Sequence, residues 1–152
     1  MSSAASQPVR PAWYVDSSVV LRIAKEGSPL AWAWFAAAVA AGDTFVASRL
    51  MPVEVLRVLR NGGLDQATAE AVIDRFVLLS IDDALTDEAL ALGPTLGASD
   101  ALHVASALRL GTGAVILVTH DAQMARAALA LGFDVRDPVA DDPYHPAVVP
   151  QP

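Results

Sequence analysis

Trp13-Tyr14-Val15-Asp16-Ser17-Ser18 is the most informative run of the sequence, because it joins three signals within a few residues. The apolar, β-type residues Trp13 to Val15 predict a short buried strand. Asp16, Ser17 and Ser18 are residue types preferred at helix N-termini, and apolar residues at helical spacing follow them. The run therefore predicts a strand that ends at an acidic residue and passes directly into a helix.

The rest of the chain repeats this alternation of short strands and helices. We expect further strands at 44–46, 77–81, 114–118 and 133–135, and helices at 29–41, 48–60, 65–76, from 86 to 92, 99–110 and 121–131. Helices that alternate with brief apolar strands are typical of a parallel sheet covered on both faces. The pattern predicts an α/β domain with a central parallel sheet of about five strands.

Length and composition fit one globular domain without a membrane span. The 152 residues are 54% hydrophobic and 18% charged, with a mean hydropathy of +0.43, which excludes a disordered chain. The longest apolar run, 30–41, is well short of the roughly 20 residues that cross a bilayer. The N-terminus has no signal-peptide pattern and cysteine is absent, so we expect a cytoplasmic protein without disulfides or thiolate sites.

Three regions are expected along the chain. A flexible N-terminus spans 1–10, the α/β domain spans 11–136, and a Pro-rich C-terminal extension spans 137–152. The extension holds five of the ten prolines, so irregular structure is expected there.

The charge balance is acidic, with 10 basic against 17 acidic residues and a net charge of −7. A protein that binds nucleic acid through its overall field is normally basic, so this chain lacks that footprint. Any chemistry on nucleic acid must therefore be local, with carboxylates screened by a cation.

Four acidic residues are expected at one edge of the sheet. Asp16 and Asp121 follow predicted strands, and Glu54 and Asp100 lie near the starts of predicted helices. Capping is the alternative explanation for Asp100 and Asp121, whereas Glu54 stands in a largely apolar stretch. Clustered carboxylates repel one another unless a cation intervenes, and oxygen ligands indicate Mg²⁺ or Mn²⁺ rather than zinc.

Four short motifs resemble those of PIN domains, and among these the VapC toxins of toxin–antitoxin pairs. They are Tyr14-Val15-Asp16-Ser17-Ser18, Pro52-Val53-Glu54-Val55-Leu56-Arg57, Ser99-Asp100-Ala101-Leu102-His103-Val104-Ala105 and Leu117-Val118-Thr119-His120-Asp121. Each motif alone is weak, but the four occur in the family's order on the expected elements. The resemblance extends from about residue 13 to 135 and implies a three-layer α/β/α sandwich.

The resemblance also implies roles for individual residues. Asp16 and Asp100 match the positions that hold the metal, and Glu54 and Asp121 complete the acidic, catalytic cluster. Ser17 or Ser18 matches a hydroxyl position that assists metal or phosphate binding. The role of His120, beside the fourth acid, stays open because the family is diverse there.

The activity implied by the resemblance is that of a toxin, a Mg²⁺- or Mn²⁺-dependent endoribonuclease that leaves 5′-phosphate and 3′-hydroxyl ends. It further implies a homodimer and neutralisation by a VapB-type antitoxin. A catalytically inactive PIN fold that acts through a protein partner is the alternative. The acidic net charge leaves the path of the RNA unexplained.

Several other residues are weaker candidates. Arginines on helices near the acidic edge are candidate phosphate contacts, although exposed arginine is usually solvated surface; these are Arg22, Arg57, Arg60 and Arg109. For His103 a packed or surface position is favoured over a place at the edge of the site. Aromatic residues of the Ala-rich helix either line a groove for an antitoxin helix or pack in the core; these are Trp32, Trp34 and Phe35. Trp13 and Tyr14 are expected in the core.

Three other α/β classes fit less well. A receiver domain needs a lysine near its last strand, but the one lysine, Lys25, lies after the first. A haloacid-dehalogenase-type phosphatase needs a second acid where Ser18 stands, and the Gly-x-Gly-x-x-Gly of a Rossmann domain is absent.

Overall fold

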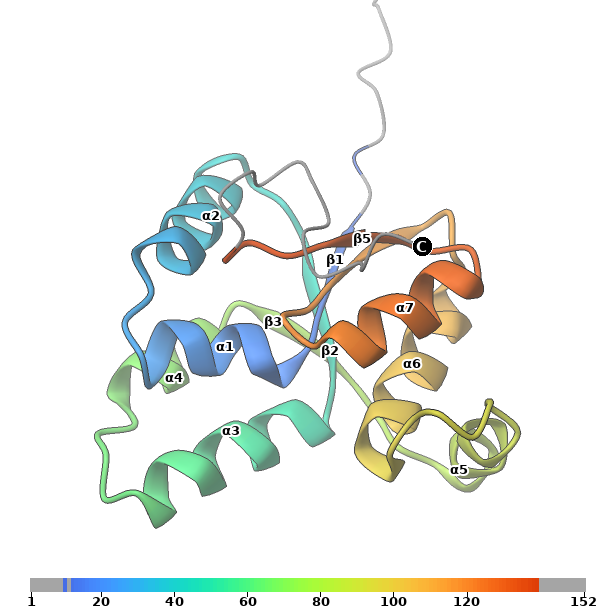
Figure 1. Cartoon of the computed structure of the whole chain (residues 1–152). Helices are drawn as coiled ribbons and strands as arrows, with labels where there is room; N and C mark the ends of the chain where they lie inside the picture. Colours follow the sequence, from blue (N-terminus) through green and yellow to red (C-terminus); the bar gives the residue numbers. More distant parts are fainter. Residues whose placement is uncertain (1–9, 11, 140–152) are drawn as a thin grey trace, which may run out of the picture.

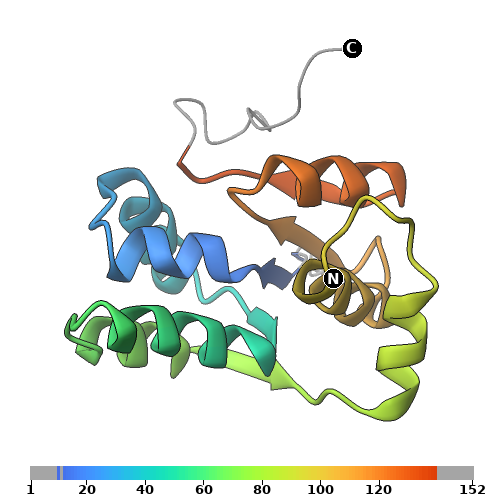
Figure 2. The ribbon, with the colours of Figure 1, turned by 60° about the horizontal axis from the view of Figure 1, so that its bottom comes forward.

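The computed structural model describes residue 10 and residues 12–139, which form a five-stranded sheet with helices on both faces (Figures 1 and 2). In chain order the elements are β1 (Ala12–Val15), α1 (Ser17–Ala24), α2 (Pro29–Ala40), β2 (Phe45–Ser48), α3 (Leu50–Asn61), α4 (Ala67–Ile73), β3 (Phe76–Leu79), α5 (Asp83–Leu90), α6 (Ala98–Leu110), β4 (Val115–Val118), α7 (Ala122–Ala130) and β5 (Asp134–Arg136). The predicted three-layer α/β/α fold is confirmed.

All strand pairs of the sheet are parallel, in the order β3-β2-β1-β4-β5. β1 lies at the centre, with Tyr14 beside Val46 of β2 and Leu117 of β4. The chain moves outward from β1 on one side, then returns to the other side through β4. The gap between β1 and β4 is thus the point where the strand order reverses, which is where α/β sheets place their sites.

Alternation along the strands divides the core into two layers. Trp13 and Val15 pack toward α1–α4, in a cluster that contains Trp34 and Phe35. Tyr14 points to the opposite face, into a cluster built with α6 and α7. Figure 2 shows these two helical layers on either side of the sheet. The core positions predicted for Trp13 and Tyr14 are confirmed.

The boundaries near β3 and α5 differ from the prediction. Phe76, expected in a helix, is the first residue of β3, because it pairs with Phe45 and stacks on that ring at a centroid distance of 5.4 Å. α5 begins at Asp83 rather than Thr86, because Asp82 accepts a hydrogen bond from the Leu85 N–H (2.8 Å) and so caps the helix.

Residues 1–9, 11 and 140–152 lie outside the described part of the chain, and most of the predicted terminal regions fall there. The described residues continue past β5 to Val139, and Asp137 is buried. Within 10 and 12–139, no helix has the length and apolarity needed to cross a membrane.

Candidate active site

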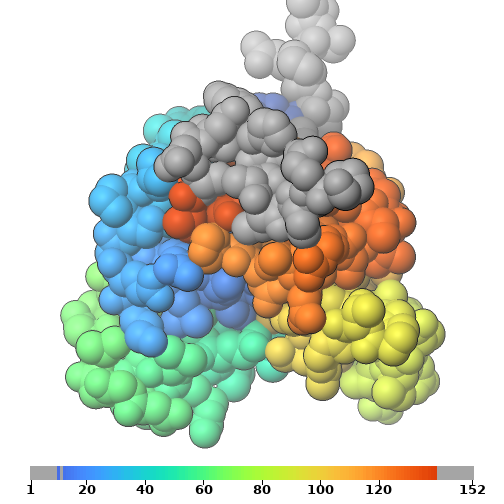
Figure 3. All heavy atoms as spheres, viewed as in Figure 1, coloured from blue at the N-terminus to red at the C-terminus, as the bar shows by residue number. Residues whose placement is uncertain are grey.

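Four helices begin at the carboxyl edge of the sheet, around the point between β1 and β4. α1 follows β1 and α7 follows β4, while α3 and α6 bring Glu54 and Asp100 to the same place. In Figure 1 the starts of α1, α3 and α7 converge near the middle of the molecule. Figure 3 shows the surface of this face, where blue, teal, gold and orange segments from these helices meet.

Asp16 is the most buried acid of this cluster, with 4% of its surface exposed. Its Oδ2 accepts hydrogen bonds from the Ser18 hydroxyl (2.7 Å) and the Thr119 hydroxyl (2.8 Å). Its Oδ1 lies 4.0 Å from Nε2 of His103. The two hydroxyls therefore fix one carboxylate oxygen and turn the other toward the remaining site residues.

Ser17 and Ser18 do not cap α1, although both are residue types preferred at helix N-termini. α1 begins at Ser17 itself, and both hydroxyls are used within the site. Ser17 donates to Oε1 of Glu54 (2.8 Å), while Ser18 donates to Asp16 and accepts from the His120 N–H (3.0 Å). Their role is to orient acids, because a hydroxyl can donate and accept at once.

His103 joins two of the acids. Its side chain is 1% exposed, and its Nε2 lies 2.5 Å from Oε1 of Glu54 and 4.0 Å from Asp16. Burial disfavours the charged form of both His103 and Glu54, but the contact between them outweighs this effect. The contact, together with the charge of Asp16, raises the pKa of His103. The same contact, together with the hydrogen bond from Ser17, lowers the pKa of Glu54. His103 is thus both buried, as favoured from the sequence, and part of the site.

Asp100, in the first turn of α6, has the opposite electrostatic situation. Burial and the charges of Asp121, Asp16 and Glu54 raise the pKa of Asp100 to about 6, against a smaller opposing effect of His103. No described residue donates a hydrogen bond to its carboxylate. Asp100 is therefore a half-buried acid among like charges, an arrangement that a cation would relieve.

Asp121 is the N-cap of α7, as the capping alternative predicts. Its Oδ1 accepts from the backbone N–H groups of Gln123 (2.8 Å) and Met124 (3.0 Å). Its own N–H donates to the Thr119 hydroxyl (3.0 Å), which also donates to Asp16. Capping does not remove Asp121 from the cluster, because its charge still acts on Asp100.

A divalent ion fits the chemistry of this site but requires some side chains to move. No group of three or more His, Asp or Glu side chains among residues 10 and 12–139 is arranged to hold a metal ion. Glu54 is engaged by His103, whereas Asp100 lacks a hydrogen-bond donor in the described chain. The oxygen-rich donor set and the repulsion at Asp100 suit Mg²⁺ or Mn²⁺.

Two residues of the site carried weak signals in the sequence. Thr119 is a single hydroxyl between a strand and an acid, yet it links Asp16 to the backbone of Asp121. Asp137 is far from the four motifs, yet both of its carboxylate oxygens contact Nδ1 of His120. For Thr119, the sequence signal that could have been used is its place in the same short run as His120 and Asp121.

The four candidate arginines differ in what they contact. Arg22 pairs with Glu26, and Arg109 is held by Asp82 and Glu88, so neither is a free cation. Arg57 and Arg60 are exposed on α3 and pair with no acid within the described residues. Only these two of the four remain candidates for contact with a phosphate.

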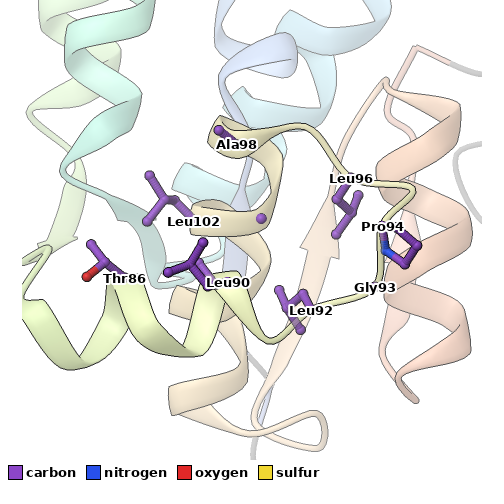
Figure 4. Close-up of a pocket in the computed structure, with 10 residues that line it drawn as sticks. Thr86, Leu90, Leu92, Gly93, Pro94, Leu96, Ala98 and Leu102 are labelled. Carbon is purple, nitrogen blue, oxygen red and sulfur yellow. The ribbon is translucent and has the colours of Figure 1, made fainter.

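Two apolar hollows lie outside the acidic cluster. An open pocket of about 450 Å³ lies between α5, the 91–97 loop and α6, and Leu90, Leu92, Leu96 and Leu102 line it (Figure 4). A groove of about 340 Å³ lies between α2 and α4, with Trp32 and Phe35 on its wall. Trp34 and Phe35 are buried in the core, whereas Trp32 is 49% exposed.

Comparison with known proteins identifies the family. A family model described as PIN domain matches residues 13–129. The fold is similar to a chain in the crystal structure of VapBC2 from Rickettsia felis bound to a DNA fragment from their promoter, with a TM-score of 0.65 and 12% identity over 83% of this chain and 98% of that one. No curated protein matches the sequence. The match covers the strands and helices that carry all four acids, and the chain belongs to the PIN domain family.

Proposed function

We propose that the protein is the toxin of a toxin–antitoxin pair and acts as a metal-dependent endoribonuclease. The proposal rests on the gathering of Asp16, Glu54, Asp100 and Asp121 at one sheet edge, where burial and the charges of the other three acids raise the pKa of Asp100 to about 6. Membership of the PIN family and the fold shared with a VapBC2 chain support the proposal.

Asp16 and Asp100 would hold the ion, which when bound activates water and offsets charge on the phosphate. Ser18 and Thr119 orient Asp16 by fixing its Oδ2. Ser17 and His103 hold Glu54 at the edge of the same cluster. These contacts fix the orientation of Asp16 and Glu54, and the ion would require other side chains of the cluster to move toward it.

In the proposed reaction, water attacks phosphorus and the bond to the 3′-oxygen breaks. The 3′-oxygen takes up a proton and leaves as a hydroxyl, and the phosphate remains on the 5′ side. Attack by the neighbouring 2′-hydroxyl would instead leave a cyclic phosphate, so the ends of the products identify the nucleophile.

The activity is tested by incubating RNA with the protein and Mg²⁺, Mn²⁺ or a chelator. Cleavage is expected with either ion, none with the chelator, and recovery when excess ion is added back. The product ends should be 5′-phosphate and 3′-hydroxyl. Cleavage that persists in the chelator contradicts metal dependence, and no cleavage under any condition favours the inactive, partner-binding alternative.

The groove between α2 and α4 is the proposed docking site for an amphipathic helix of a VapB-type antitoxin. Trp32 is half exposed there, in contact with Phe35 at a ring-centroid distance of 6.1 Å. An exposed tryptophan on an apolar groove is the kind of residue that dominates binding energy.

Trp32→Ala is expected to weaken binding of the antitoxin by about 30-fold or more, because buried interface tryptophans contribute at least about 2 kcal/mol. Calorimetry with the protein encoded beside this gene measures the change. Leu131→Ala, at an exposed leucine at the end of α7, is the matched control. Equal affinities for the Trp32→Ala variant and the parent chain would place the antitoxin elsewhere.

A homodimer is also proposed, with the pocket between α5 and α6 as the covered surface. Leu90, on the rim of this pocket, is 83% exposed, and contiguous exposed apolar surface of this kind commonly marks an interface. Sedimentation equilibrium reports the mass directly.

A further inference from the structure

His120 and Asp137 form a pair that the proposed reaction has not used. Nδ1 of His120 lies 3.1 and 2.9 Å from the two carboxylate oxygens of Asp137. Asp137 is 2% exposed, and its Oδ1 also accepts from the Val139 N–H (2.9 Å). The imidazole is therefore held in one orientation by a buried acceptor.

The pair is attached directly to the acidic cluster. The His120 N–H donates to the Ser18 hydroxyl (3.0 Å), and that hydroxyl donates to Asp16 (2.7 Å). In the sequence His120 lies between Thr119 and Asp121. The Thr119 hydroxyl donates to Asp16. The backbone of His120 is therefore held at the edge of the acidic cluster, where a substrate phosphodiester is proposed to bind.

The contact with Asp137 determines what the other ring nitrogen offers. A carboxylate accepts hydrogen bonds, so Nδ1 is the donor, and Nε2 of the neutral ring is left as an acceptor. No described residue donates to Nε2, and the side chain is 27% exposed. Nε2 of His120 is thus a hydrogen-bond acceptor with a fixed orientation at the edge of the site, and no described residue donates to it.

We propose that Nε2 of His120 accepts a hydrogen bond from a ribose 2′-hydroxyl beside the scissile phosphate, and so favours RNA over DNA. The 2′-hydroxyl is the hydrogen-bond donor of the RNA backbone, and DNA lacks it. This inference rests on the proposed function. It makes His120 a specificity-determining residue, and Asp137 the residue that positions it.

Two substitutions separate this role from a purely structural one. In His120→Asn the amide nitrogen lies near the position of Nδ1, so the contact with Asp137 is kept and the acceptor is lost. In His120→Gln the amide lies near the position of Nε2, so an acceptor is kept and the contact with Asp137 is lost. A purely structural role of His120 predicts that His120→Gln is the more impaired variant in cleavage, whereas substrate recognition predicts that His120→Asn is.

The experiment uses an RNA that the wild-type protein cleaves at a mapped bond, and a set of copies with single 2′-deoxy nucleotides around that bond. One deoxy position is expected to lower kcat/KM of the wild type about tenfold, the size of one lost hydrogen bond. His120→Asn should be about tenfold slower on the all-ribose substrate, with no further loss at that position. His120→Gln should retain most of the deoxy effect.

The outcomes distinguish this inference from the proposed function. A deoxy effect that persists in His120→Asn, or no deoxy effect in the wild type, overturns the 2′-hydroxyl contact while leaving the nuclease intact. Equal slowing of ribose and deoxy substrates by His120→Asn points to a phosphate contact and also overturns it. If the wild type cleaves no RNA with either ion, the proposed function fails and this inference falls with it.

Discussion

Asp16→Asn and Asp100→Asn are each expected to reduce RNA cleavage by more than about 100-fold. Loss of a residue that merely orients a metal ligand costs about 10- to 100-fold, so loss of a ligand should cost more. Asparagine keeps the shape of the side chain, and at position 16 its oxygen can still accept from Ser18 and Thr119. Initial cleavage rates at saturating Mg²⁺ measure the effect.

A matched control is available on α5. Asp87 is exposed and lies outside the acidic cluster, so Asp87→Asn removes the same charge without affecting the site. It should cleave at the wild-type rate. Rates near wild type in either Asp16→Asn or Asp100→Asn would contradict the assignment of the metal ligands.

Asp100→Asn should also make the ion-free protein more stable. Since folding raises the pKa of Asp100 to about 6, its charged form is disfavoured in the native state, and stability falls as the pH rises toward that value. Above pH 6 the neutral variant should gain about 1 kcal/mol after screening by solvent, or roughly 2–4 °C in Tm. Thermal unfolding in a chelator at pH 7.5 measures this, and a lower Tm for the variant would contradict the electrostatic account.

His103→Leu is expected to lower the free energy of unfolding by about 3 kcal/mol or more. The substitution leaves Glu54 and the buried Asp16 without their imidazole partner, and breaking a buried charged pair costs about 3–5 kcal/mol. Urea denaturation in a chelator measures the loss. His103→Gln is the control, because its amide can still donate near the position of Nε2 and should recover part of the stability.

The pH dependence of this loss has a defined sign. Because folding raises the pKa of His103, its contribution to stability is complete below its unfolded pKa of roughly 6.5. This contribution is lost as the pH rises through the pKa of the folded state. The lowered pKa of Glu54 means that its contribution is lost as the pH falls through the folded value. The difference in free energy of unfolding between wild type and His103→Leu should therefore be largest in mild acid. A difference that increases at alkaline pH would contradict the pairing.

Most of the fold could be predicted because β1, β2, β3 and β4 are short apolar runs next to a helix signal. The boundary of β3 failed because a tertiary contact decides it: Phe76 joins β3 by stacking on Phe45 from another strand, and local propensity cannot register that contact. The start of α5 is a different case, because its cap is the local contact of Asp82 with the Leu85 N–H, which an N-cap assignment at Asp82 would have found.

The acids of the site were predictable, but the groups that orient them were not. Asp16 and Asp121 follow strands, so their placement follows from topology alone. His103 was undervalued because its partner, Glu54, lies on a different helix. Asp137 lies in the segment interpreted as a Pro-rich extension, and only the pairing of β4 with β5 brings it beside His120.

Direct titration of Mn²⁺ into the protein, followed by the loss of the free-ion paramagnetic resonance signal, tests the central claim. The account predicts binding by the wild-type chain and by Asp87→Asn, and greatly weakened binding by Asp16→Asn and by Asp100→Asn alike, because both carboxylates hold one ion. Undiminished Mn²⁺ binding in either of the last two variants would show that these acids share no ion.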